Sequence, residues 1–121
     1  MKKLKIYIAS PYIAGNPNAN VEKQLYAASL LVDAGCKPYV PLFNHFIQIR
    51  RNKFDDVWLN LELEWLVECD AVFRLQGYCE RTEREIEFAR SKNIPVLFSM
   101  NEVLDFISQH KKITKSNGKK A

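Results

Sequence analysis

A glutamate that should face an apolar side is the first residue with the potential for chemistry. Residues 57–68 have helical periodicity, and the polar residues Asn60, Glu64 and Glu68 recur every four positions, which predicts one solvent-facing stripe. At ~100° per residue, Glu62 falls about 160–200° from Asn60 and Glu64, among apolar residues. Burying an unpaired carboxylate is costly, so Glu62 needs a partner or a function. The alternatives are that the helix frays or that a nearby arginine pairs with Glu62.

A second glutamate lies at the start of a later predicted helix, residues 82–92. Thr82 and Glu85 match a capping box, which explains a glutamate at this position without any function. The free amides and dipole of a helix N-terminus also favour an ionised carboxylate, and a nucleophilic glutamate must be ionised. Both interpretations of Glu85 stay open.

Two carboxylates in one cleft are typical of acetal chemistry, in which one attacks the anomeric carbon and the other handles protons or holds the sugar. Tyr7 and Tyr12 flank the end of the first predicted strand, where they either donate hydroxyl hydrogen bonds or only pack. The segment 10–15, which begins Ser10-Pro11, precedes a helix and is placed to hold a 5′-hydroxyl or a phosphate. It matches neither a Walker A loop nor a GxGxxG motif.

Strands and helices alternate along the whole chain. The predicted strands are 4–9, 38–41, 71–75 and 95–98, and the predicted helices are 21–34, 57–68, 82–92 and 100–110, the last opened by a capping box of Ser99 and Glu102. This alternation predicts an α/β fold with a parallel sheet of four to five strands and helices on both faces. A fifth strand would have to come from residues 42–56.

The carboxyl ends of parallel strands are where such folds bind ligands. Residues 10–20, 42–51, 76–84 and 99–101 follow predicted strands, so we expect them at the binding edge. Asp70 precedes its strand and belongs at the opposite edge.

Composition indicates one small globular domain. The net charge of +4 comes mostly from five lysines after residue 110, and the rest of the chain has 13 basic and 14 acidic residues. We therefore expect a domain over residues 1–110, a disordered basic tail over 111–121, and no nucleic-acid face. No apolar run approaches the ~20 residues of a membrane span, and no signal peptide is evident, so we expect a cytoplasmic protein. Three cysteines without zinc-ligand spacing predict reduced thiols and no metal site.

Several short motifs together resemble the nucleoside 2-deoxyribosyltransferase superfamily, including its small phage and bacterial relatives. The resemblance covers residues 4–98, and it lies in segments 6–12 (IYIASPY), 34–38 (AGCKP), 41–45 (PLFNH), 69–72 (CDAV), 85–89 (EIEFA) and 93–96 (NIPV). It implies a flavodoxin-like sheet and enzymes that cleave the N-glycosidic bond of (deoxy)nucleosides or nucleotides.

The resemblance also implies roles for individual residues. The family's nucleophile lies four residues before a small residue, which matches Glu85 and Ala89. A helical acid, usually aspartate, lies eight residues before the aspartate at the third strand, which matches Glu62 and Asp70. The tyrosine of the first strand corresponds best to Tyr7.

Two positions depart from the family pattern. Cys79 stands where a Ser or Asp holds the sugar or its phosphate, and Arg81 stands where a glycine lets the backbone approach the ligand. Glu80 is a possible substitute for the lost acid.

We therefore expect N-glycosidic bond cleavage or transfer through a glutamate nucleophile, Glu85, without a cofactor. Glu62 and Tyr7 complete the expected catalytic set, and the expected substrate-binding residues are Ser10, Pro11, Tyr12, His45, Gly77, Cys79 and Arg81. The alternatives are a non-catalytic module that binds a nucleotide or an ADP-ribose-type ligand and a scaffold whose basic tail contacts nucleic acid. We also expect a homodimer or larger homo-oligomer, because Trp58 and Trp65 lie on a very apolar helix and relatives complete their sites across subunits.

Overall fold

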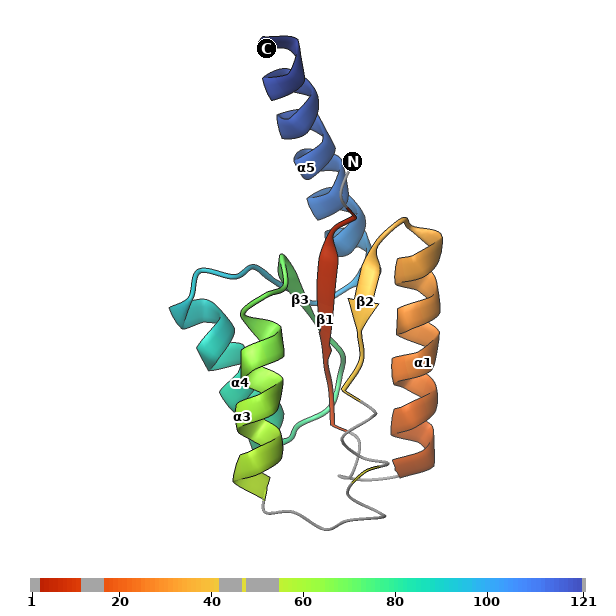
Figure 1. Cartoon of the computed structure of the whole chain (residues 1–121). Coiled ribbons are helices and arrows are strands. Elements are labelled where there is room, and N and C mark those ends of the chain that lie inside the picture. Colours follow the sequence, from red (N-terminus) through yellow and green to blue (C-terminus); the bar gives the residue numbers. More distant parts are fainter. Residues whose placement is uncertain (1–2, 12–16, 42–46, 48–54, 121) are drawn as a thin grey trace.

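The chain forms alternating strands and helices, as the sequence predicts. The structure, a computed structural model, describes residues 3–11, 17–41, 47 and 55–120 (Figure 1). Its elements are β1 (Lys5–Ala9), α1 (Pro17–Asp33), β2 (Lys37–Tyr39), α3 (Asp55–Leu66), β3 (Ala71–Arg74), α4 (Glu80–Ser91), β4 (Val96–Leu97) and α5 (Met100–Lys120).

All pairings in the described sheet are parallel. The strand order is β2-β1-β3-β4, and Tyr7 in β1 is in register with Tyr39 in β2 and Val72 in β3. β1 lies between two strands and under helices, so its residues Ile6–Ala9 are completely buried. This arrangement confirms the predicted α/β, flavodoxin-like fold. Most of the region from which a fifth strand would come, residues 42–56, lies outside the described residues.

Alternate residues of β1 face two separate cores. Ile6 and Ile8 pack with Leu31 of α1 and Val103 of α5 on one face of the sheet. Tyr7 and Ala9 pack on the other face, with buried side chains of α3 and α4. Figure 1 shows α1 on one side of the sheet and α3 and α4 on the other. Because strand side chains alternate, the register of β1 aims Tyr7 at the two helices that carry Glu62 and Glu85.

Connections at the sheet edges agree with the predicted topology. Asp70 lies at the amino-terminal edge, where its Oδ2 accepts a hydrogen bond from the Lys5 backbone N–H at 2.8 Å. After β4, Ser99 and Glu102 form the predicted capping box. The Glu102 N–H donates to Ser99 Oγ at 3.2 Å, and the Phe98 N–H donates to Glu102 Oε2 at 2.8 Å.

The last helix is longer than predicted. α5 continues to Lys120, ten residues beyond His110, so residues 111–120 extend the helix where we expected a disordered tail. The lysines in this segment are good helix formers, and it contains no proline to stop the helix. The expectation of disorder rested on the charge and low complexity of the segment and took no account of its helix propensity.

The expectations about cysteines and membrane spans can also be compared with the structure. Cys36, Cys69 and Cys79 are free thiols. Among the described residues, no helix combines the length and apolar character that crossing a membrane requires. Trp58 is buried, whereas 46% of Trp65 is exposed on the same helix, and the oligomeric state stays a prediction.

The capping box at the start of α5 should contribute measurably to stability. Replacing Ser99 by Ala removes the side-chain acceptor for the Glu102 N–H, so we expect the free energy of unfolding to fall by about 1 kcal/mol. Urea denaturation monitored by circular dichroism measures this difference. Ser91→Ala is the control, because the exposed Ser91 hydroxyl only donates to the Phe88 carbonyl near the end of α4. Equal losses for the two variants would contradict a specific capping role.

Candidate active site

A buried hydrogen bond joins the sheet to α4. The Tyr7 hydroxyl donates to Glu85 Oε2, and the two residues are 0% and 4% exposed. Tyr7 is supplied by the central strand, and Glu85 by the second turn of α4, next to the buried Ile86 and Ala89. The structure therefore brings together two of the three residues predicted to be catalytic.

Glu62 faces inward, as its position on the helix predicts. It is 1% exposed and lies between the buried Trp58 and Leu66, one turn to either side on α3. The Arg81 Nε donates to Glu62 Oε2 at 3.1 Å. The alternative of a nearby arginine partner is therefore confirmed. That partner is Arg81 on α4, a residue that we predicted to bind substrate.

One small cavity contains both carboxylates. Its volume is about 40 Å³, and it is lined by Ser10, Pro11, Pro41, Glu62, Cys79, Arg81, Thr82 and Glu85. These residues lie at or beyond the carboxyl ends of β1, β2 and β3 or on α3 and α4, which is the edge where parallel sheets bind ligands. A volume of this size admits one or two water-sized groups, so only the reacting part of a larger ligand fits inside it.

Burial changes the protonation of Glu85. Desolvation, reinforced by the charge of Glu62, raises the pKa of Glu85 to about 8, although the Tyr7 hydrogen bond and the charge of Arg81 act in the opposite direction. Burial and the two nearby carboxylates also raise the pKa of Tyr7 well above its ordinary value. The expectation that the helix N-terminus keeps Glu85 ionised is therefore wrong. Glu85 lies beyond the first turn, where the helix dipole acts most strongly.

The capping-box interpretation of Glu85 is also wrong. α4 begins at Glu80, and its N-cap is Cys79, which makes no side-chain capping hydrogen bond. Thr82 is consequently the third helical residue, and its side chain is 1% exposed and lines the cavity. The Glu85 carboxylate accepts a hydrogen bond from Tyr7 rather than capping the helix.

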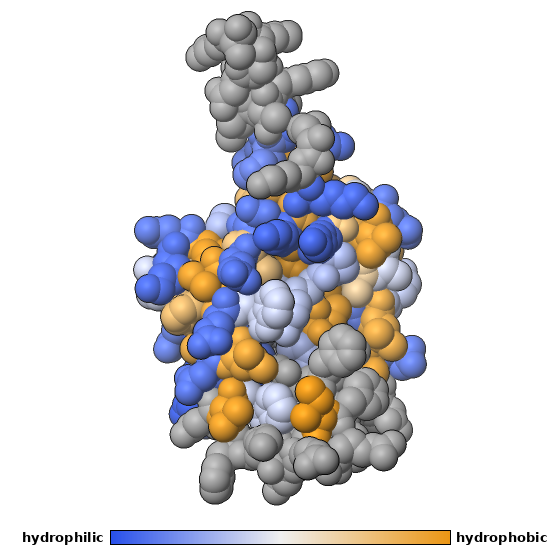
Figure 2. Space-filling model, viewed as in Figure 1, coloured by the Kyte–Doolittle hydropathy of each residue, from blue (hydrophilic) through white to orange (hydrophobic). Residues whose placement is uncertain are grey.

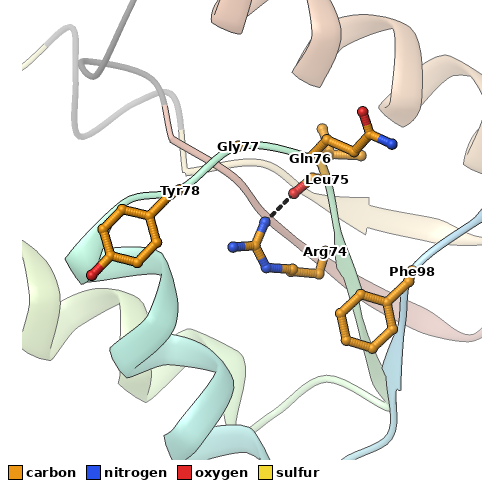
Figure 3. A pocket seen from close by; sticks show the side chains of 6 residues that line it. All are labelled: Arg74, Leu75, Gln76, Gly77, Tyr78 and Phe98. Atoms are coloured by element: carbon orange, nitrogen blue, oxygen red, sulfur yellow. Dashed lines mark hydrogen bonds between the residues drawn. The ribbon is translucent and has the colours of Figure 1, made fainter.

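Gly77 does not line this cavity. It lines a second cavity of about 450 Å³ with Arg74, Leu75, Gln76, Tyr78 and Phe98, where Arg74 donates to the Leu75 carbonyl (Figure 3). The φ of Gly77 is +120°, and a Cβ at this position would lie 3.0 Å from Cγ of Pro11. Gly77 therefore allows the loop after β3 to approach Pro11, which does line the Glu85 cavity.

The remaining predicted residues have different outcomes. Ser10, Pro11, Cys79 and Arg81 line the cavity, and the Ser10 hydroxyl donates to the Pro11 carbonyl at 3.2 Å. Tyr12 and His45 lie outside the described residues. Within residues 3–11, 17–41, 47 and 55–120, no group of three or more His, Cys, Asp or Glu side chains is arranged to hold a metal ion.

Three residues near the site were not predicted. Pro41 and Thr82 line the cavity, and Tyr39 stacks on the buried Tyr7 with ring centroids 5.5 Å apart. Tyr39 was detectable in principle, because parallel pairing of the first two predicted strands places it beside Tyr7. Thr82 matches a capping box in the sequence, and that match predicts a residue at the helix start rather than a side chain that lines a cavity.

The raised pKa of Glu85 should make stability depend on pH. With a pKa of about 8 in the folded protein and an ordinary value of 4.5 when unfolded, the folded state holds the extra proton between these values. The free energy of unfolding should therefore fall as pH rises from about 4.5 to about 8, on the order of a few kcal/mol. Urea denaturation at several pH values measures this slope.

The Glu85→Gln variant cannot ionise at this position, so this part of the slope should disappear. Glu87→Gln is the matched control, because Glu87 is exposed on the same helix and should leave the slope unchanged. A Glu85→Gln variant with the same pH dependence as the wild type would show that Glu85 titrates normally.

Two solved structures have folds similar to this chain. One is a 2-deoxyribosyltransferase from the psychrotolerant bacterium Bacillus psychrosaccharolyticus, with 23% sequence identity, a TM-score of 0.62, and coverage of 76% of this chain and 69% of that protein. The other is a conserved protein from Enterococcus faecalis V583, with 24% identity, a TM-score of 0.64, and coverage of 78% of this chain and 62% of that protein. At these identities the likeness shows a shared fold.

Sequence comparison gives the family. No curated protein matches the chain. Residues 4–99 match DUF7768, which is described as a domain of unknown function, and this range contains every described residue that lines the Glu85 cavity. The chain therefore belongs to the DUF7768 family.

Proposed function

We propose that the Glu85 cavity cleaves or transfers the N-glycosidic bond of a (deoxy)nucleoside or nucleotide. The observation that carries this proposal is the buried carboxylate of Glu85, which Tyr7 holds by a hydrogen bond inside a cavity that also contains Glu62. The shared fold with a 2-deoxyribosyltransferase supports the same class of reaction.

Glu85 acts as the nucleophile in this proposal. Its carboxylate oxygen attacks C1′ of the sugar, the bond from C1′ to the base nitrogen breaks, and the electron pair leaves with the base, which takes up a proton. Water that attacks C1′ of the glycosyl-enzyme then gives hydrolysis, and a second base gives transfer. Tyr7 orients the attacking carboxylate through its hydrogen bond.

Glu62 and Arg81 also line the cavity, where they form an ion pair. The 3.1 Å contact with Arg81 Nε fixes the direction of the Glu62 carboxylate, which is placed to accept hydrogen bonds from sugar hydroxyls or to help the departing base. Because the cavity is only about 40 Å³, it receives the sugar carbon that reacts, and the base and any phosphate lie outside it.

Two observations favour a second candidate, a module that binds a nucleotide or an ADP-ribose-type ligand without turnover. Arg81 pairs with Glu62 inside the cavity, and burial leaves Glu85 mostly protonated at neutral pH. A protonated Glu85 cannot act as the nucleophile, and the Arg81 ion pair occupies the Glu62 carboxylate that would otherwise hold the sugar or help the base leave. Tight binding measured by calorimetry, without any release of base, would favour this candidate.

Base release tests the catalytic proposal directly. The protein is incubated with deoxynucleosides and their 5′-monophosphates, with and without an acceptor base, and free base or exchanged product is measured by chromatography. We expect Glu85→Gln to lower the rate by at least about 10³-fold, because it removes the nucleophile. Glu87→Gln, on the exposed side of α4, should keep the wild-type rate. Equal rates for Glu85→Gln and the wild type would remove Glu85 from the mechanism.

The pH dependence of kcat/KM tests which form of Glu85 reacts. Because the nucleophile must be ionised, kcat/KM should rise with pH and level off above about 8, the pKa of Glu85 in the free protein. The Tyr7 hydrogen bond lowers that pKa, so Tyr7→Phe should move the midpoint to higher pH. A profile that falls across this range would show that protonated Glu85 is the active form.

A further inference from the structure

A cavity at the opposite end of the sheet lies outside the proposed site. It has a volume of about 140 Å³, and it is lined by Lys5, Lys37, Pro38, Tyr39, Trp65, Glu68 and Cys69. Lys5 and Lys37 are the first residues of β1 and β2, so the cavity lies at the amino-terminal edge of the strands. In Figure 2, side chains of near-neutral hydropathy lie between α3 and β2, and strongly hydrophilic side chains border them toward this edge.

Stacked aromatic rings form one wall of this cavity. The rings of Tyr39 and Trp65 stack with centroids 5.0 Å apart and an interplanar angle of 20°, and Tyr39 also stacks on the buried Tyr7. The stack ends at Trp65, which is 46% exposed. A further planar ring can continue such a stack, and stacking of a base on an aromatic side chain contributes about 1–3 kcal/mol.

Two lysines stand side by side at the rim. Lys5 and Lys37 are register partners on neighbouring parallel strands, and both are exposed. In the part of the chain that the structure describes, neither ammonium group has an ion pair within 4.0 Å. Like charges directly opposite each other are unfavourable, so an anion between them would stabilise this edge. The carboxylate of Glu68, on the same cavity, is an acceptor for an N–H group.

We propose that this cavity binds a purine nucleoside 5′-monophosphate. The base stacks against Trp65 and its amino group donates to Glu68, while the phosphate lies between the ammonium groups of Lys5 and Lys37. Cavities for whole drug-sized ligands are about 300–1,000 Å³, so this smaller one takes the base and leaves the phosphate at the rim. The proposal is independent of the reaction at Glu85, because the two cavities share no residue.

Indole NMR signals give a direct measurement of binding. The chain has two tryptophans, so a ¹⁵N-labelled protein gives two indole N–H signals, and Trp65→Phe identifies which belongs to Trp65. Adenosine 5′-monophosphate, adenosine and inorganic phosphate are titrated separately into Glu85→Gln protein, in which turnover at the other site is blocked. We expect the monophosphate to shift the Trp65 signal saturably. The buried Trp58 lies one turn from Glu62, so its signal reports separately on ligand that enters the Glu85 cavity.

Variants separate the two halves of the site. Lys37→Ala should weaken monophosphate binding by about tenfold or more, because it removes a charge-assisted contact to phosphate. Lys23→Ala is the matched control, because Lys23 is an exposed lysine on α1 and does not line the cavity. Adenosine and inorganic phosphate should each bind at least about tenfold more weakly than the monophosphate.

Three results would overturn the proposal. They are an unmoved Trp65 signal, equal affinity for adenosine and its monophosphate, and monophosphate binding that Lys37→Ala leaves unchanged. None of them bears on base release by the Glu85 cavity, which is measured separately on protein with Glu85 intact.

Discussion

The hydrogen bond between Tyr7 and Glu85 is the interaction on which the rest of the site depends. It joins the central strand to α4 between two buried side chains, where an unpaired polar group would cost about 1–3 kcal/mol. The strand register fixes Tyr7, since moving β1 by one residue would turn this side chain toward α1 and α5. The fold therefore places the Glu85 carboxylate beside the Tyr7 hydroxyl.

A second polar pair shares the same buried layer. Glu62 and Arg81 are 2% and 19% exposed at their side chains, so both have lost much of their hydration. A buried ion pair is often no more stabilising than apolar residues of the same size, which makes it weak evidence for a structural purpose. Two carboxylates and one arginine around a small cavity are suited to binding a polar ligand, which is the role that we propose for them. The raised pKa of Glu85 follows from the same crowding, because the charge of Glu62 adds to the effect of burial.

Much of the fold was predictable because its signals are local. Alternating residues in β1 and turn residues between elements were enough to predict a parallel α/β sheet, and helical periodicity alone was enough to place Glu62 on the inner side of α3. What could not be predicted depends on contacts between distant segments. The hydrogen bond from Tyr7 to Glu85 joins residues 78 positions apart, and no local motif encodes that contact.

The errors have a common physical origin. The capping box of Thr82 and Glu85 and the ionised state of Glu85 were both inferred from the helix terminus alone. Burial against β1 and α3 outweighs these local preferences, because removing a carboxylate from water costs more than a helix dipole returns. Gly77 was placed in the site by its position after β3, whereas its backbone supports the site from outside by approaching Pro11.

A crystal structure of the Glu85→Gln variant soaked with a deoxynucleoside 5′-monophosphate tests the central claim most directly. The account predicts that the reacting edge of the sugar enters the cavity lined by Glu62 and residue 85, with C1′ about 3–3.5 Å from the side-chain oxygen of residue 85. A sugar bound elsewhere, with the cavity beside residue 85 empty, would contradict it.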